Sequence, residues 1–191
     1  MEGGFDFTVI WTNIAHFMVG RYPSGPMGGV LLTLYLAIVS LFLSFLGGMI
    51  LGLMCVVRNP LIRYPTLAVV NLVRGIPLLL VIFWMYFLLP FVMGRTMPEA
   101  WTVIAALSIF TSAYMSQIVQ AGIEGIPKGQ TEAALSTGLH PWMAMVFIVL
   151  PQALRNMIPS FVNQFVSMIK DTSLAFIVGV SELTHVATQV N

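Results

Sequence analysis

The chain has 191 residues, of which 58% are hydrophobic and 8% are charged, and its formal net charge at pH 7 is +1. Soluble domains average about 45–50% apolar and about 25% charged residues, so the composition predicts an integral membrane protein without a large soluble domain. The near-neutral charge gives no basis for nucleic-acid binding. Cys55 is the single cysteine, which excludes an internal disulfide.

Long uncharged stretches predict where the chain crosses the membrane, because a helix of about 20 apolar residues spans the hydrocarbon core. We expect four spans, at about 28–57, 65–93, 99–123 and 151–170. The first contains no charged residue. The uncharged part of the second, Ile76 to Met93, has Pro77 near its start and Pro90 near its end, which limit its regular part. The predicted fold class is therefore all-α and membrane-spanning.

The region after residue 140 has a less regular pattern, because Pro151 and Pro159 interrupt it. We expect a surface-lying helix near 141–150 and the fourth span from Pro151 onward. The stretch 172–181 is too short to cross the membrane. We expect it to be a re-entrant or interfacial segment, which requires protein or water to cover its backbone.

Basic residues near the ends of the spans predict the orientation of the chain. Arg58 and Arg63 lie between the first two spans with no acidic residue nearby, so we expect this loop in the cytoplasm. Segment 1–27 is then extracytoplasmic. It begins with the acidic residues Glu2 and Asp6 and has no basic cluster there, so we expect no cleaved signal peptide.

A polar island, Lys128–Gly138, stands between apolar stretches in the expected cytoplasmic loop 124–150. Pro127 suits the first turn of a helix, where its missing N–H costs nothing, and the alanines that follow favour a helix. Gly138 is a natural stop in the left-handed conformation. The island therefore predicts a short helix with defined ends, whose small side chains let another backbone come close. An ordinary connecting loop with a helical turn is the alternative from these residues alone.

Five sequence blocks, in order and at the expected distances, resemble the permease subunits of type I ATP-binding-cassette (ABC) importers for polar amino acids, which are binding-protein-dependent inner-membrane components. The blocks are Arg74–Leu79, Ile126–Gln130, Glu132–Ala134 with Gly138, Leu150–Arg155, and Asn163 with Lys170–Leu174 and Glu182–Leu183. The resemblance implies a permease domain over 28–191 in the bacterial cytoplasmic (inner) membrane. It also implies a fifth span, which the sequence up to Asn191 does not include.

The resemblance further implies that a separate ABC ATPase drives transport through the island. The residues it assigns to this coupling are Glu132, Ala133, Ala134 and Gly138. A phosphate loop of its own would require Gly-x-x-x-x-Gly-Lys-Ser/Thr, and the sequence contains no Gly-Lys pair. We therefore expect no cofactor on this chain, with ATP and Mg²⁺ on the partner. The other implied partners are a second permease subunit, identical or a sister chain, an extracytoplasmic amino-acid-binding protein, and the lipid bilayer.

Polar side chains on and after the fourth expected span are candidates for a substrate path, because alternating access needs a polar route between spans. The candidates are Asn163, Gln164, Ser167, Lys170, Thr172 and Ser173. A similar series on the third span consists of Thr111, Ser112, Gln117 and Gln120. Hydrogen bonding between helices is the alternative interpretation, and for Lys170 an interfacial anchor is another.

Other classes of function fit the sequence less well. A membrane enzyme would need paired carboxylates, a histidine cluster or a nucleophile motif, and no such motif is recognisable. His16, His140 and His185 are scattered, so we expect no metal site. A self-sufficient ion-coupled carrier or channel is the alternative function, but it would need charges inside the membrane, and the centres of the first two expected spans contain none.

Overall fold

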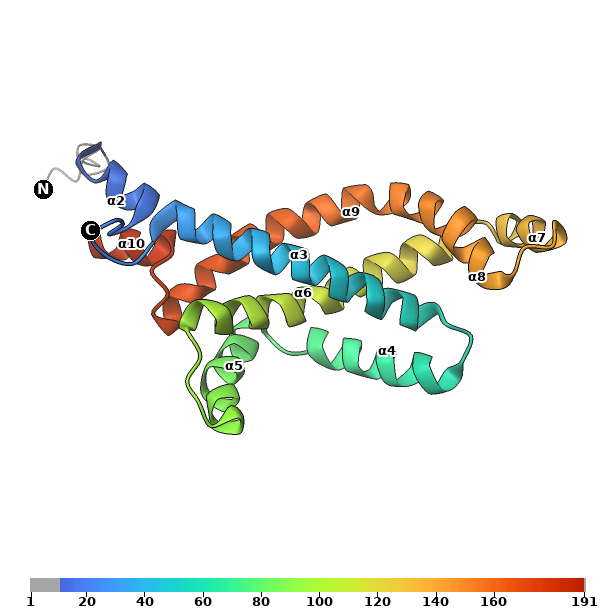
Figure 1. Ribbon diagram of the computed structural model, residues 1–191, viewed down its shortest axis with the longest axis horizontal. Coiled ribbons are helices and arrows are strands. Elements are labelled where there is room, and N and C mark those ends of the chain that lie inside the picture. Colours follow the sequence, from blue (N-terminus) through green and yellow to red (C-terminus); the bar gives the residue numbers. More distant parts are fainter. Residues whose placement is uncertain (1–10, 191) are drawn as a thin grey trace, which may run out of the picture. The chain divides into compact units, whose positions relative to one another are not determined.

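The computed structural model describes residues 11–190, and the regular structure in this range is helical (Figure 1). The helices are α2 (Ile14–Val19), α3 (Gly29–Val56), α4 (Pro60–Arg74), α5 (Leu78–Met93), α6 (Glu99–Glu124), α7 (Lys128–Ser136), α8 (Pro141–Met143), the π-helix η1 (Ala144–Val149), α9 (Leu150–Asp171), the 3₁₀-helix η2 (Thr172–Val178) and α10 (Leu183–Val190). Within the described range, β-structure is limited to isolated bridges. The all-α prediction is confirmed. Glu2, Asp6 and Asn191, on which expectations about the termini rest, lie outside the described residues.

Three segments are long and apolar enough to cross a membrane: α3, α6, and the helical run Pro141–Val178. The expected second span, 65–93, differs from the structure, which has two helices there. α4 ends at Arg74 and α5 begins at Leu78, and together they pass only as a broken span. The break has a local cause, because Pro77 lacks an N–H and disfavours helical geometry at the residue before it.

The helical run after residue 140 also differs from expectation, because it does not stop at Pro151. η1 passes directly into α9, which continues through Pro159 to Asp171. The N–H of Leu150 reaches back to the carbonyl of Met145, one residue further than in an α-helix. A π-turn of this kind widens the helix, and we infer that it accommodates the ring of Pro151. The segment expected to be re-entrant or interfacial begins with η2, which continues directly from α9.

The chain divides into two compact units. The central unit consists of Leu41–Pro77 and Ser108–Ser167, and the terminal unit consists of Met1–Ser40, Leu78–Leu107 and Met168–Asn191. The long helices α3, α6 and α9 each contribute residues to both units.

In the central unit, α3 and α6 pack at close range because α3 carries glycines at the contact. A Cβ at Gly48 would collide with the Cβ of Met115, and one at Gly52 would collide with the side chain of Val119. Small residues of this kind let membrane helices approach backbone to backbone. The hydroxyl of Ser112 adds a hydrogen bond to the Ser44 carbonyl at 3.4 Å.

The terminal unit brings the start of α3 against the end of the chain. The N–H of Gly29 donates to the Ser181 carbonyl at 2.9 Å, and the N–H of Leu183 donates to Oγ1 of Thr33 at 3.1 Å. α10 packs on α2 and on η2, and α5 also packs on η2. The carboxylate of Glu182, which is buried, accepts the N–H groups of Thr184 and His185 and so caps the start of α10.

Candidate functional site: an exposed helical knob and a polar groove

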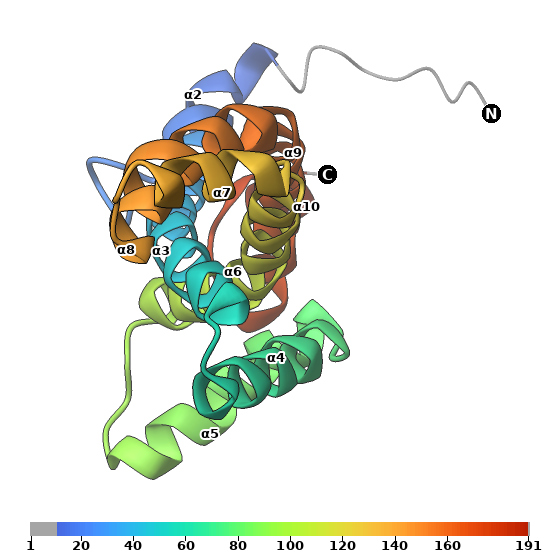
Figure 2. The ribbon, with the colours of Figure 1, turned by 90° about the vertical axis from the view of Figure 1, so that its right-hand side faces the viewer.

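The polar island forms a protruding structure, which we call the knob and define as residues 127–140. Its helix α7 runs from Lys128 to Ser136, immediately after Pro127, which has extended backbone angles. Figure 2 views the molecule from the side of α7 and α8, and both short helices face the viewer. The start predicted from Pro127 is confirmed. The helix has nine residues and is thus longer than the single helical turn of the alternative. The role of the knob in coupling stays a prediction.

The end of α7 is fixed by two backbone hydrogen bonds around Gly138. The N–H of Gly138 donates to the Leu135 carbonyl at 3.0 Å, and the N–H of Leu139 donates to the Ala134 carbonyl at 3.3 Å. Gly138 has a φ of 85°. This pattern with a left-handed residue is the Schellman helix end, so the predicted stop at Gly138 is confirmed. A Cβ at Gly138 would meet no atom within 4 Å, so the requirement for glycine here is conformational.

The four residues assigned to coupling separate into two groups by burial. Glu132, Ala133 and Gly138 are exposed, whereas Ala134 is only 6% exposed. α7 packs against η1, so a buried residue of α7 faces the chain itself. Ala134 therefore holds α7 in place, while the side chains of Glu132 and Ala133 remain available to another molecule.

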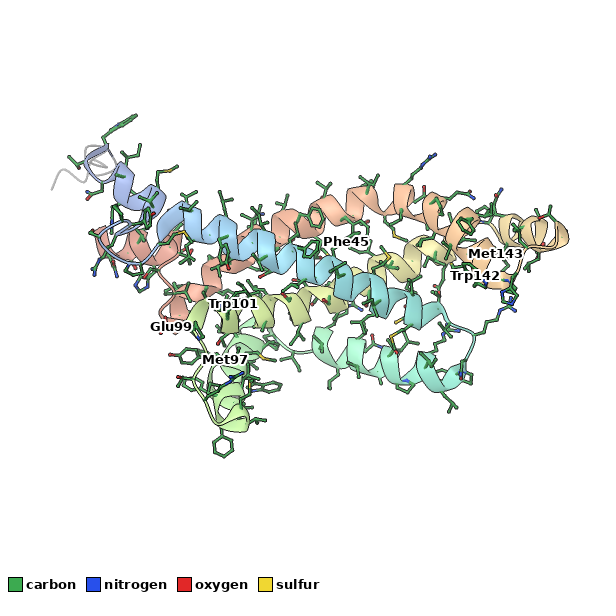
Figure 3. All side chains as sticks on the ribbon, in the orientation of Figure 1. Phe45, Met97, Glu99, Trp101, Trp142 and Met143 are labelled. Carbon is green, nitrogen blue, oxygen red and sulfur yellow. The ribbon has the colours of Figure 1, made fainter. Side chains whose placement is uncertain are left out.

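The knob is attached to the long helices of the central unit by an apolar cluster. Ile126, just before α7, is buried together with Ile123 of α6, Val149 of η1 and Met157 of α9. One polar contact adds to this attachment: Nε2 of Gln152, in the first turn of α9, donates to Oε1 of Gln130 in α7 at 3.3 Å. Trp142 and Met143 lie on α8 beside the knob (Figure 3). The knob is therefore joined to α6 and α9 by direct packing.

A groove of about 500 Å³ opens between α6 and α9 in the central unit. Its lining residues are Gln117, Ile118, Ala121, Gly122, Gly125, Asn156, Met157 and Ser160. The polar groups come from both helices, with Gln117 on α6 and Asn156 and Ser160 on α9. Gln120 and Glu124 extend the polar face of α6, since Nε2 of Gln120 donates to Oε1 of Glu124 at 3.0 Å.

Sequence reasoning did not include Asn156 and Ser160 among the candidate site residues. Both are exposed, and with Asn163 and Ser167 they recur at intervals of three or four residues along α9. This spacing places all four on one face of a helix. We call these four residues the polar stripe. The spacing was visible in the sequence, but the groove that gives it meaning requires α6 beside α9.

The predicted path residues occupy different environments. Asn163 and Ser167 are exposed on the polar stripe, and Gln164 is half-buried on a neighbouring face of α9. Lys170, in the terminal unit, is exposed in the last turn of α9. Thr172 is fully buried and its hydroxyl donates to the Ile169 carbonyl at 2.7 Å.

Ser173, in the same unit, is half-buried, and its hydroxyl donates to the Lys170 carbonyl at 2.6 Å. The hydroxyls of Thr172 and Ser173 are thus both engaged within the chain.

The candidate residues of α6 also differ in their surroundings. Thr111 and Ser112 are buried, whereas Gln117 lines the groove. The interpretation as helix–helix hydrogen bonding therefore fits Ser112, whose hydroxyl bonds to α3.

Arg74, the last residue of α4, stacks over the ring of Tyr114 with 5.2 Å between its Cζ atom and the ring centroid. Tyr114 in turn donates its hydroxyl to the Arg74 carbonyl at 3.4 Å. Among residues 11–190, no three His, Cys, Asp or Glu side chains are grouped so that they could hold a metal ion.

The chain was compared with known proteins. Residues 44–190 match the family described as binding-protein-dependent transport system inner membrane component. The probable glutamine ABC transporter permease protein GlnP of Bacillus subtilis is 44% identical over 163 residues, covering 85% of this chain and 74% of that protein. The glutamate/aspartate import permease protein GltK of Escherichia coli O157:H7 is 32% identical over 177 residues, covering 88% of this chain and 79% of that protein.

A solved structure agrees with the sequence comparisons. The crystal structure of an amino acid ABC transporter with histidines matches with a TM-score of 0.84 at 29% identity, covering 98% of this chain and 83% of that chain. The helical fold is thus that of type I ABC-importer permeases. The chain belongs to the family of binding-protein-dependent transport system inner membrane components, the membrane-spanning permease subunits of ABC importers.

Proposed function

We propose that this chain is the permease subunit of an ABC importer that moves polar amino acids across the bacterial cytoplasmic membrane, and that a separate ATPase drives it through α7. The similar proteins named for glutamine and for glutamate/aspartate transport support the substrate class. The single observation that carries the coupling proposal is the exposed knob, which is joined to α6 and α9 by buried apolar contacts.

The exposed face of α7 is suited to contact with another protein. Glu132 offers a carboxylate, and Ala133 and Gly129 are small and exposed. A Cβ at Gly129 would meet no atom within 4 Å, so the space beside α7 is open to a partner. We assign the direct contact to Glu132 and Ala133, and we assign the shape of the knob to Ala134 and Gly138.

Transmission of force follows from the attachments of the knob. Closure of an ATPase dimer would displace α7, and the cluster around Ile126 would pass that displacement to α6 and α9. These two helices border the polar groove, so a change in their separation would change the width of the groove. In this proposal, ATP and Mg²⁺ bind to the partner only.

The groove and the polar stripe are the proposed route for substrate through the central unit. Polar side chains exposed on a membrane helix are costly when they face lipid, so the polar stripe calls for water or another protein in front of it. A second permease subunit, identical or a sister chain, fits this requirement. An extracytoplasmic amino-acid-binding protein would deliver the substrate, as the description of the family implies.

Co-purification with the ATPase subunit tests the coupling proposal. Ala133→Arg places a long charged side chain at the centre of the proposed contact, and we expect it to lower the recovery of ATPase by about thirtyfold, the effect of losing a strong interface residue. Ala15→Arg is the matched control, because Ala15 is also exposed on a helix but belongs to the terminal unit. Equal recovery from both variants contradicts the role of α7.

Uptake into proteoliposomes separates the proposed function from the alternative carrier or channel. With the ATPase and the binding protein present, uptake should require ATP in the compartment that α7 faces. Uptake that persists without the ATPase and follows an ion gradient would support the carrier instead. Competition with glutamine, glutamate, histidine and arginine then identifies the substrate.

A further inference from the structure

A second groove, of about 330 Å³, lies on the other side of α9 in the central unit. We call it the Arg155 groove. Its walls are Phe45 of α3 and Leu154, Ile158, Phe161, Val162 and Phe165 of α9, with Arg155 at one end. Phe45 projects from α3 (Figure 3), and its ring meets that of Phe161 edge to face at a centroid distance of 5.4 Å.

Arg155 is the one charged residue among those that line this groove. Its side chain is exposed, and no described residue provides it with a carboxylate partner. Arg155 follows the knob closely along the chain, since α9 begins at Leu150. A guanidinium fork matches the oxygens of a phosphate group and binds them through charge-assisted hydrogen bonds.

The length of the apolar wall fits a lipid acyl chain. From Arg155 to Phe165, α9 rises by about 15 Å, which is half of the roughly 30 Å hydrocarbon core. One leaflet of a bilayer has this thickness. A lipid whose phosphate lies at Arg155 would therefore lay one acyl chain along the aromatic and aliphatic wall.

We propose that the Arg155 groove binds an anionic phospholipid from the leaflet on the side of the knob, with its phosphate on Arg155 and an acyl chain against Ile158 and Phe165. The charge selects an anionic headgroup, and the apolar wall selects a lipid over a free phosphate ion. Because the lipid would bridge α3 and α9, the site also links bilayer composition to the two helices that Phe45 and Phe161 hold together.

Native mass spectrometry of the purified permease with its accompanying subunits tests this proposal. The probes are phosphatidylglycerol and phosphatidylcholine with identical acyl chains, added in equal amounts. We expect the wild-type protein to retain phosphatidylglycerol preferentially. Arg155→Gln should lower its binding by about tenfold, as expected for the loss of a hydrogen bond to a charged group, while Arg155→Lys should keep an intermediate preference.

The controls separate the site from general surface charge. Arg58→Gln is the matched control, because Arg58 is an exposed arginine of the same unit that does not line the groove. It should leave the preference unchanged. Ile158→Trp retains the charge but fills the groove, and it should reduce the binding of both lipids; Ile158 is 57% exposed, so the fold tolerates the larger ring.

Three outcomes would overturn the proposal. The first is an equal loss in the Arg58→Gln and Arg155→Gln variants, which indicates diffuse attraction. The second is displacement of phosphatidylglycerol by millimolar inorganic phosphate, which indicates an anion site without a lipid chain. The third is a disulfide between two permease copies in a Val162→Cys, Cys55→Ser variant, which shows that a second subunit covers the groove.

Discussion

The side-chain amide of Gln152 joins two helices, since its Nε2 atom donates both to Oε1 of Gln130 in α7 at 3.3 Å and to the carbonyl of Ile148 in η1 at 2.8 Å. This one group thus ties the knob to the start of α9. An exposed hydrogen bond of this kind contributes only about 0.5–1.5 kcal/mol. Its effect should therefore appear in the transmission of movement rather than in the stability of the fold.

Gln152→Leu should lower the amount of substrate taken up per ATP hydrolysed, while the melting temperature changes little. The measurement is the ratio of uptake to phosphate release in proteoliposomes. Gln189→Leu is the matched control, because Gln189 is exposed on α10 in the terminal unit. If Gln152→Leu and Gln189→Leu give the same ratio, the contact with Gln130 has no part in coupling.

Gly138 should tolerate asparagine better than alanine. A residue with a side chain pays about 1–2 kcal/mol in the left-handed conformation, which asparagine adopts more readily. We expect Gly138→Ala to weaken ATPase binding and Gly138→Asn to retain more of it. Gly138→Asp should stay in the membrane but uncouple hydrolysis from uptake. Normal uptake by the aspartate variant, or equal binding by all three, would count against the assigned role of Gly138.

Two Gly→Ala changes should shift stability in opposite directions. At Gly52, the new Cβ would collide with the side chain of Val119 and approach the Ser116 carbonyl to 2.9 Å, so we expect a loss of about 1–3 kcal/mol from overpacking. At Gly129 there is open space, and removing a helical glycine should raise stability by up to about 1 kcal/mol. Thermal unfolding in detergent measures both, and a destabilised Gly129→Ala with an unchanged Gly52→Ala would refute the packing described for α3 and α6.

Glu182 should control the order of the last helix. Its two carboxylate oxygens accept the N–H groups of Thr184 and His185, each at 2.9 Å. Loss of a helix cap costs about 0.5–2 kcal/mol. We expect Glu182→Ala to speed hydrogen exchange at the amides of α10, and Glu182→Gln to have a smaller effect. Exchange in α4 serves as the internal reference, because α4 belongs to the other unit.

The polar stripe should matter for uptake and not for ATPase binding. Asn163→Leu removes one polar group of the stripe, and we expect uptake to fall at least about tenfold if one strong hydrogen bond to the moving substrate is lost. Ile169→Leu is the matched control, because Ile169 is exposed on α9 and lies two residues from Ser167, away from the face of the polar stripe. Both variants should bind the ATPase normally. Unchanged uptake by Asn163→Leu would remove this residue from the proposed path.

The local features of the knob could be predicted from the sequence, because they depend on neighbouring residues alone. Pro127 and Gly138 mark the two ends of α7 through their own backbone preferences, and the structure places the helix between them. The burial of Ala134 could not be predicted, since it depends on η1 packing against α7. A helical pattern does not reveal which face another element will cover.

The course of the chain at its prolines was harder to predict. Pro77 coincides with a break between α4 and α5, whereas Pro151 lies inside a continuous helix preceded by a π-turn. Each proline lacks its backbone N–H. The two outcomes, a break at Pro77 and a continuous helix at Pro151, therefore differ because of the turn that precedes each proline. For the substrate path, Thr172 was a candidate by type and spacing, but its burial and its bond to Ile169 engage its hydroxyl.

The uninterrupted passage from η1 into α9 has a mechanical consequence. α7 ends at Ser136 and is followed by the turn 137–140, but it packs against η1, and no break separates η1 from the helix that carries the polar stripe. In the proposed coupling, a displacement that α7 passes to η1 would therefore turn or tilt α9 directly. In the proposed coupling, the π-turn at Ala144–Val149 would be the point where this helical run bends. Its residues would then set how far the polar stripe moves in each ATPase cycle.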